Sequence, residues 1–220
     1  MVFGTNNWEP DNENREKLAR IFEEIFAYTS EPQNAAMLES AREQYQSRVG
    51  KPFEDDHDFI QRMNTFLEWF IFDFQPEGGI PGAIFTSYLE RARHESTTDE
   101  MIIRMEISKN MHSLFLVNEY RGSVVKVRDV INRKTYYVTH EDNLEEGDLL
   151  ESRIVVIGKK SFFTHTHCLH PKFVLGTLKK AVKKIGRDMI TPEFFIMIES
   201  MQLKWRRSRQ IDIKHIYNFG

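Results

Sequence analysis

The chain has 220 residues, a formal net charge of −3 and 40% hydrophobic residues. A chain of this length and composition can bury a sizeable core, which excludes global disorder. Cys168 is the sole cysteine, so an internal disulfide and a four-cysteine zinc site are both excluded. The first ten residues contain no cationic stretch followed by an apolar run, so we expect no secretory signal and a cytoplasmic location.

Positive charge is concentrated towards the carboxyl end. Residues 172–220 hold eleven Lys and Arg against four Asp and Glu, a difference of +7. The chain as a whole has 30 and 33 of these residues, so the preceding part holds nineteen against twenty-nine, a difference of −10. This asymmetry predicts a basic carboxyl-terminal region joined to an acidic body.

The first half of the sequence predicts five helices. Apolar residues at helical spacing predict amphipathic helices at 12–29, 32–49, 83–92 and 98–111. The segment 58–74 is apolar on most of its circumference, so it must be covered from at least two sides. It is too polar to span a bilayer. We therefore predict a helical domain at residues 1–112, with the segment 58–74 at its centre and no membrane span.

Two carboxylates fall inside this central apolar helix. An unpaired buried carboxylate costs several kcal/mol or shifts its pKa. Glu68 and Asp73 are five residues apart, on different faces of the helix, so we do not expect a catalytic pair. We expect Asp73 to accept backbone N–H groups of the Gly78–Gly79 turn or to pair with Arg91, Arg93 or Arg104.

At Ser113 the hydrophobic period changes from 3.6 to 2. Runs rich in Val, Ile, Tyr and Phe follow at 114–120, 124–131, 134–140, 149–157 and 161–166. Five short antiparallel strands predict a small closed barrel at residues 113–170, of the SH3-like or OB-like kind, because closure removes unpaired edges. The helical period returns after Pro171, which predicts a basic helical region at 171–220. The predicted fold class is α+β.

A series of segments between Phe59 and Pro171 carries a family resemblance. In chain order they are Phe66–Asp73, the Gly78–Gly79 turn, Tyr88, Ser113–Val117, Val125–Asp129, Gly147–Arg153 and His170–Pro171. This order resembles a set of uncharacterised bacterial proteins in which a helix-then-barrel unit often accompanies a SEC-C zinc motif. The cysteine pairs of that motif are absent here, so the resemblance implies the architecture and no zinc role.

The basic region supplies the main candidate binding residues. They are Lys179, Lys180, Lys183, Lys184, Arg187, Lys204, Arg206, Arg207 and Arg209. A cationic face of this kind could bind an acidic protein partner, and a lysine-rich face is also typical of a solvated helix. The same cations could instead dock on the chain's own acidic body or on that of a second copy, which would form a homo-oligomer. Our leading hypothesis is a non-catalytic interaction protein that binds an acidic protein partner and needs no cofactor.

An RNA- or single-stranded-DNA-binding module is the first alternative. The cations would neutralise phosphates, and barrel aromatics would stack on bases. The candidate aromatic residues are Tyr136, Tyr137, Phe162 and Phe163. Affinity for any polyanionic strand that falls steeply with salt would distinguish this alternative.

A metal-binding protein is the second alternative. His165, His167, Cys168 and His170 lie within six residues and are ligand types that zinc and copper favour. On a strand, His165 and His167 would point to the same side, but consecutive strand residues cannot surround a metal without a ligand from elsewhere. We find no nucleophile elbow, P-loop, dinucleotide fingerprint or His-Glu-x-x-His motif, so we do not expect an enzyme.

Overall fold

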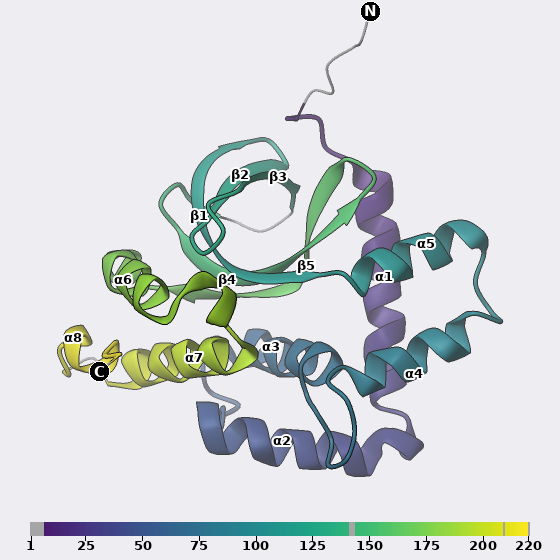
Figure 1. Cartoon of the computed structure of the whole chain (residues 1–220), viewed down its shortest axis with the longest axis horizontal. Coiled ribbons are helices and arrows are strands. Elements are labelled where there is room, and N and C mark those ends of the chain that lie inside the picture. Colours follow the sequence, from purple (N-terminus) through teal and green to yellow (C-terminus); the bar gives the residue numbers. More distant parts are fainter. Residues whose placement is uncertain (1–6, 141–143, 209, 220) are drawn as a thin grey trace, which may run out of the picture.

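The structure is a computed structural model of the whole chain, and it describes residues 7–140, 144–208 and 210–219. It has the mixed α+β class that the sequence predicts. The described part holds eight α-helices and one five-stranded sheet. Figure 1 shows the sheet on one side of the molecule, with the helices beneath it and along its edges.

The amino-terminal half forms a helical layer. Its helices are α1 (Asn12–Thr29), α2 (Ala35–Val49), α3 (Phe59–Phe72), α4 (Ala83–Ala92) and α5 (Thr98–Ile107). Helix α3 is the central one, because it packs against α2, α4 and strand β5 (Lys160–His170). Phe70 and Ile71 of α3 are fully buried, in agreement with an apolar helix that is covered from more than one side.

The strands close on themselves. In chain order they are β1 (Met111–Arg121), β2 (Val124–Asp129), β3 (Thr135–Thr139), β4 (Leu149–Ile157) and β5. Neighbouring strands follow the order β1-β2-β3-β5-β4, and β4 pairs back onto β1 to complete a closed barrel. All pairs are antiparallel except β3 with β5. Apolar side chains such as Phe115, Val127 and Leu150 fill one buried cluster of this barrel.

Strand β5 is longer than its sequence pattern indicates. The apolar alternation ends near Thr166, yet the strand continues to His170. It continues because β4 offers partners along its whole length, with Glu151 opposite Cys168 and Leu149 opposite His170. A polar strand segment is thus held by backbone pairing and not by its own hydrophobic pattern.

The carboxyl-terminal helices cover one wall of the barrel. They are α6 (Leu175–Ile185), α7 (Pro192–Arg207) and the short α8 (Ile213–Ile216). One hydrophobic cluster joins Leu114 and Leu149 of the barrel to Leu178 of α6 and Ile198 of α7. Helix α7 also packs against α2, so it lies between the barrel and the helical layer. Among the described residues, no helix combines the length and the apolar character that a membrane crossing requires.

Candidate functional site: a cationic groove

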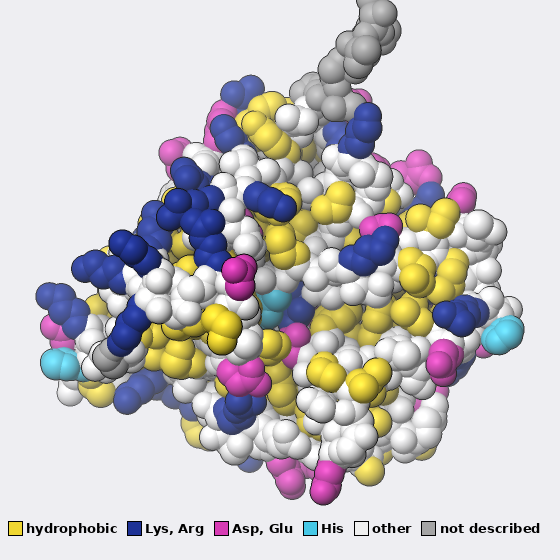
Figure 2. Space-filling view, in the orientation of Figure 1, with side chains coloured by type: hydrophobic (Ala, Val, Ile, Leu, Met, Phe, Trp, Pro, Cys, Tyr) yellow, Lys and Arg dark blue, Asp and Glu magenta, His cyan; other side chains and the backbone are white. Residues whose placement is uncertain are grey.

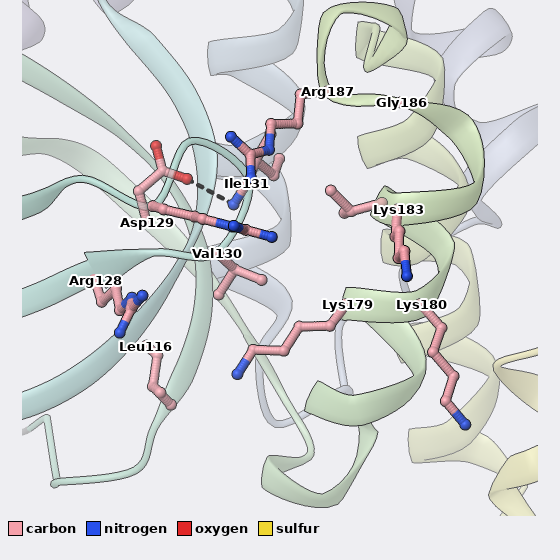
Figure 3. A pocket seen from close by; sticks show the side chains of 12 residues that line it. Leu116, Arg128, Asp129, Val130, Ile131, Lys179, Lys180, Lys183, Gly186 and Arg187 are labelled. Atoms are coloured by element: carbon pink, nitrogen blue, oxygen red, sulfur yellow. Dashed lines mark hydrogen bonds between the residues drawn. The ribbon is translucent and has the colours of Figure 1, made fainter.

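A hollow of the surface lies between the barrel and α6. Its volume is about 570 Å³, and Figure 3 shows its lining side chains in close-up. We call it the cationic groove, and it is lined by Leu116, Arg128, Asp129, Val130, Ile131, Arg133, Lys179, Lys180, Val182, Lys183, Gly186 and Arg187. Six of these twelve residues are Lys or Arg, whereas Asp129 is the only acid.

Helix α6 supplies one side of the groove because it is strongly amphipathic. Leu178, Ala181 and Val182 are buried against the barrel wall. Lys179 and Lys180 lie between these residues and Lys183 follows them, and all three lysine side chains are exposed. Burial of the apolar face therefore fixes the lysine face towards solvent.

The turn between β2 and β3 supplies the opposite side. The Asp129 carboxylate organises this turn, because its Oδ1 accepts hydrogen bonds from Ser113 Oγ at 2.7 Å, Ile131 N at 2.8 Å and Asn132 N at 2.9 Å. Its Oδ2 accepts from Asn132 Nδ2 at 2.9 Å. Arg133 adopts a left-handed backbone conformation, with φ of 62°, and its N–H donates to Asp129 O. The turn thereby presents an exposed arginine to the groove.

The Asp129 charge is already engaged by the turn. The residue is fully buried, and the four donors from Ser113, Ile131 and Asn132 surround its carboxylate. Ile131, which packs into the cluster with α6, holds the turn against the helix. The acid thus serves the local fold and does not pair with the cations of the groove.

The six cations of the groove are exposed, and no acid in the described part of the chain pairs with them. Arg128, Arg133 and Arg187 are exposed, as are the three lysines of α6. None of the six forms an ion pair with a carboxylate of the described residues. Figure 2 shows Lys and Arg side chains gathered over α6 and the adjoining part of the barrel. Like charges at this density repel each other, by about 0.5 kcal/mol for a pair 8 Å apart in water before salt screening.

The cations of α7 behave differently from those of α6. Arg206 Nε lies 3.6 Å from Asp58, and Arg207 Nη2 lies 2.5 Å from Asp56. Arg207 also donates to Lys51 O and covers the ring of Phe53 at 4.4 Å. These two arginines are therefore docked on the acidic segment that precedes α3.

The remaining predicted basic residues are dispersed. Lys204 is exposed on α7, beside a separate hollow that Arg48 and Glu193 also line. Lys184 is exposed on α6 outside the lining of the groove. Arg209 lies outside the described residues. Of the nine predicted cations, the groove brings together Lys179, Lys180, Lys183 and Arg187.

The aromatic residues proposed for base stacking lie elsewhere. Phe162 and Phe163 are buried, with 1% and 8% of their surface exposed. Tyr136 packs edge-on against Phe115, and Tyr137 packs edge-on against Trp8. No aromatic ring is present among the lining residues of the groove.

The predicted histidine–cysteine cluster is divided between the two faces of β5. Cys168 and His170 are buried on one face, whereas His167 alternates with them on the other. His165 is exposed and packs edge-on against Phe26. The buried pair lies beside Glu151 of β4, a residue that the sequence analysis did not connect with it.

A buried polar network surrounds this pair. His170 Nε2 lies 3.4 Å from Glu151 Oε2, and His112 Nε2 lies 2.9 Å from Glu151 Oε1. Burial raises the pKa of the Glu151 carboxyl well above its ordinary value, and contact with the Glu199 carboxyl adds to that shift. Burial also raises the pKa of Glu199, whose carboxylate accepts from Tyr45 Oη. Burial lowers the pKa of His170 to about 3, which keeps its ring neutral.

Glu68 of α3 and Asp73, which directly follows this helix, both have partners in the barrel. Glu68 accepts from Thr164 Oγ1 and from the backbone N–H of residues 165 and 166 on β5. Burial raises its pKa to about 7. Asp73 binds the guanidinium of Arg153. The sequence had led us to expect the glycine turn or one of three other arginines as its partner, namely Arg91, Arg93 or Arg104. The expectation was wrong because the partner comes from β4, which sequence neighbours cannot reveal.

Sequence reasoning missed two groove residues, Arg128 and Arg133. The signal was present in the segment Arg128–Lys134, which holds three cations and one acid. We did not connect it with α6 because the contact depends on Ile131 packing into the barrel–helix cluster. Only the tertiary structure brings the two basic segments face to face.

By fold and site, the chain is an α+β protein with a cationic groove between a strand turn and a helix. It belongs to the family of unknown function DUF7986, whose profile matches residues 8–192. This match includes the whole groove. No curated protein and no solved structure matches the chain.

Proposed function

We propose that the protein is a non-catalytic interaction protein whose cationic groove binds an acidic segment of a protein partner. One observation carries the proposal: six exposed cations surround an aliphatic floor, and no described acid neutralises them. A carboxylate-bearing peptide complements the rim by charge. An apolar side chain of the same peptide would fill the floor, which Leu116, Val130 and Val182 form.

The aliphatic floor favours a protein over a nucleic acid. Sequence-tolerant binding of single strands relies on aromatic rings as stacking platforms, and the groove lining has none. Exposed apolar side chains are present at the last residue of α6 and just beyond it, where Ile185 is 38% and Met189 is 68% exposed. Exposed apolar residues beside a polar rim are typical of protein interfaces.

Several finer expectations belong to this hypothesis. A parallel β3–β5 pair in a five-stranded closed order favours the OB-like over the SH3-like alternative. The division at residues 112 and 170, the cytoplasmic location, the bacterial origin and the association of relatives with a SEC-C motif remain predictions. So does a homo-oligomer in which one copy supplies the acidic segment.

Fluorescence anisotropy with three labelled probes tests the proposal. The first is a short glutamate peptide with one central leucine, the second replaces that leucine with serine, and the third is an oligouridylate of equal charge. We expect the leucine peptide to bind most tightly and its affinity to fall with added salt, since exposed charges are screened. Tighter binding of the oligouridylate would favour the nucleic-acid alternative, and binding of none of the three at low salt would overturn the proposal.

Sedimentation at low salt provides a complementary outcome. If a second copy of the chain supplies the acidic segment, the protein self-associates without any probe, and the glutamate peptide dissociates it. A monomer that still binds the leucine peptide supports a separate partner.

A further inference from the structure

Three side chains of metal-ligand type converge where β4 and β5 pair, on the side of the barrel that faces α7. Glu151 and Cys168 are direct partners across the two antiparallel strands, and His170 lies two residues beyond Cys168 on the same face. The carboxylate, thiol and imidazole ligand atoms all lie within 4.8 Å of one another. We infer that Glu151, Cys168 and His170 form a binding site for a divalent transition metal of the zinc class, independent of the cationic groove.

The ligand types specify the class of metal. A thiolate and an imidazole favour zinc-like ions, whereas magnesium and calcium prefer all-oxygen sites. The ligand atoms of a tetrahedral zinc site lie roughly 3.3 to 3.8 Å apart, given its bond lengths. The distance from His170 Nε2 to Glu151 Oε2 is 3.4 Å, so this pair already has the spacing of two ligands on one ion.

Hydrogen bonds orient both the His170 ring and the Glu151 carboxylate for such a site. His170 Nδ1 lies 3.0 Å from Tyr217 Oη, which leaves Nε2 directed at the ligand cluster. Glu151 Oε1 is held by His112 Nε2 at 2.9 Å, which leaves Oε2 towards His170. A partner on the non-ligating atom of each ligand is the usual support of a protein metal site.

The local charge balance also favours a cation. Two acids at this place, Glu151 and Glu199, are 2% and 4% exposed, so water does little to stabilise a negative charge on either. The nearby guanidinium groups already have other partners. Arg153 contacts Asp73 and Asn110. Arg62 contacts Asp58 and Gln202.

Metal binding would replace protons at this site. The Cys168 thiol would lose its proton, and the His170 ring would contribute the lone pair of Nε2. A cavity of about 10 Å³ borders Cys168 and Glu199, with Asp58 and Arg62 also in its lining. That space is comparable to one water-sized sphere, so Glu199 or a water is available as a further ligand.

The test uses the full chain, stripped of metal and then titrated with zinc or cobalt(II). We expect one equivalent of metal, proton release on binding, and a thiolate-to-cobalt charge-transfer band in the absorption spectrum. Cys168→Ser and His170→Asn should each remove this band and weaken zinc binding more than tenfold, because even loss of a supporting group costs 10- to 100-fold. His165→Ala and His167→Ala are matched controls on the same strand and should retain it.

The cobalt spectrum of the unmodified chain does not depend on whether the variants fold. Absence of the charge-transfer band, or less than about a tenth of an equivalent of bound zinc with unchanged stability in chelator, would overturn the inference. So would binding that survives in folded Cys168→Ser and His170→Asn but is lost in His165→Ala.

Discussion

Reversing two groove charges is the strongest perturbation of the proposed function. Lys179 and Lys183 are exposed, lie one helical turn apart and form no ion pair within the described chain. An exposed ion pair is worth roughly 0.5 kcal/mol, and reversal replaces that attraction by a similar repulsion. The double variant Lys179→Glu/Lys183→Glu should therefore lose about 2 kcal/mol of binding free energy, which is roughly a thirtyfold weaker affinity for the leucine-containing glutamate peptide.

The matched control reverses two exposed cations of the helical layer. Arg20→Glu/Arg93→Glu changes the net charge by the same amount, far from the groove. Peptide affinity should change less than threefold in this control, because separated exposed charges are screened in salt. Thermal unfolding gives a second readout: the groove variant should be at least as stable as the parent, since like-charge repulsion is relieved. Equal loss of binding in both variants, or a marked loss of stability in the groove variant, would refute the reasoning.

Three further predictions concern the buried ion pairs and the docked arginine. Arg153→Met leaves the Asp73 carboxylate, whose side chain is only 10% exposed, without its guanidinium partner. The free energy of unfolding in urea should then fall by about 3 to 5 kcal/mol, and a loss below about 1 kcal/mol would contradict a largely buried pair. Burial raises the pKa of Glu68 from 4.5 to about 7. Between these two pH values the folded state keeps a proton on Glu68 that the unfolded state loses. The free energy of unfolding therefore falls as the pH rises from 4.5 to about 7. Glu68→Gln should then gain about 3 kcal/mol over the parent between pH 4.5 and about pH 8, whereas a constant difference would show that Glu68 is ionised throughout. Arg207→Glu breaks the partly exposed pair with Asp56 and should cost about 1 kcal/mol of stability without weakening peptide binding; weaker binding would extend the interface to α7.

Local pattern was sufficient for most of the elements. The aromatic density around Phe70 indicated a helix covered on several sides, and Phe70 is fully buried. The alternation at 149–157 predicted β4 with its observed bounds. The helical period after Pro171 predicted the carboxyl-terminal helices, and in α6 the apolar positions Leu178 and Val182 face the protein. These features depend on interactions within a few residues, so periodicity reveals them.

The partners of charged residues could not be predicted in the same way. Arg207 finds Asp56 across about 150 positions of the chain, and Arg153 finds Asp73 across 80. The sequence allowed both docking and exposure for the basic region, and the structure divides it: α6 presents its cations while α7 docks two of its own. This difference follows from the direction in which each helix buries its apolar side. The number of charged residues in the sequence does not reveal that direction.

Lysine footprinting tests the central claim most directly. The full chain is acetylated briefly with and without the leucine-containing glutamate peptide, and each modified lysine is quantified by mass spectrometry. The proposal predicts that the peptide protects Lys179, Lys180 and Lys183 several-fold, while Lys109 and Lys204 react at unchanged rates. Protection that is uniform over all five lysines, or is confined to Lys109 and Lys204, would contradict a binding site in the cationic groove.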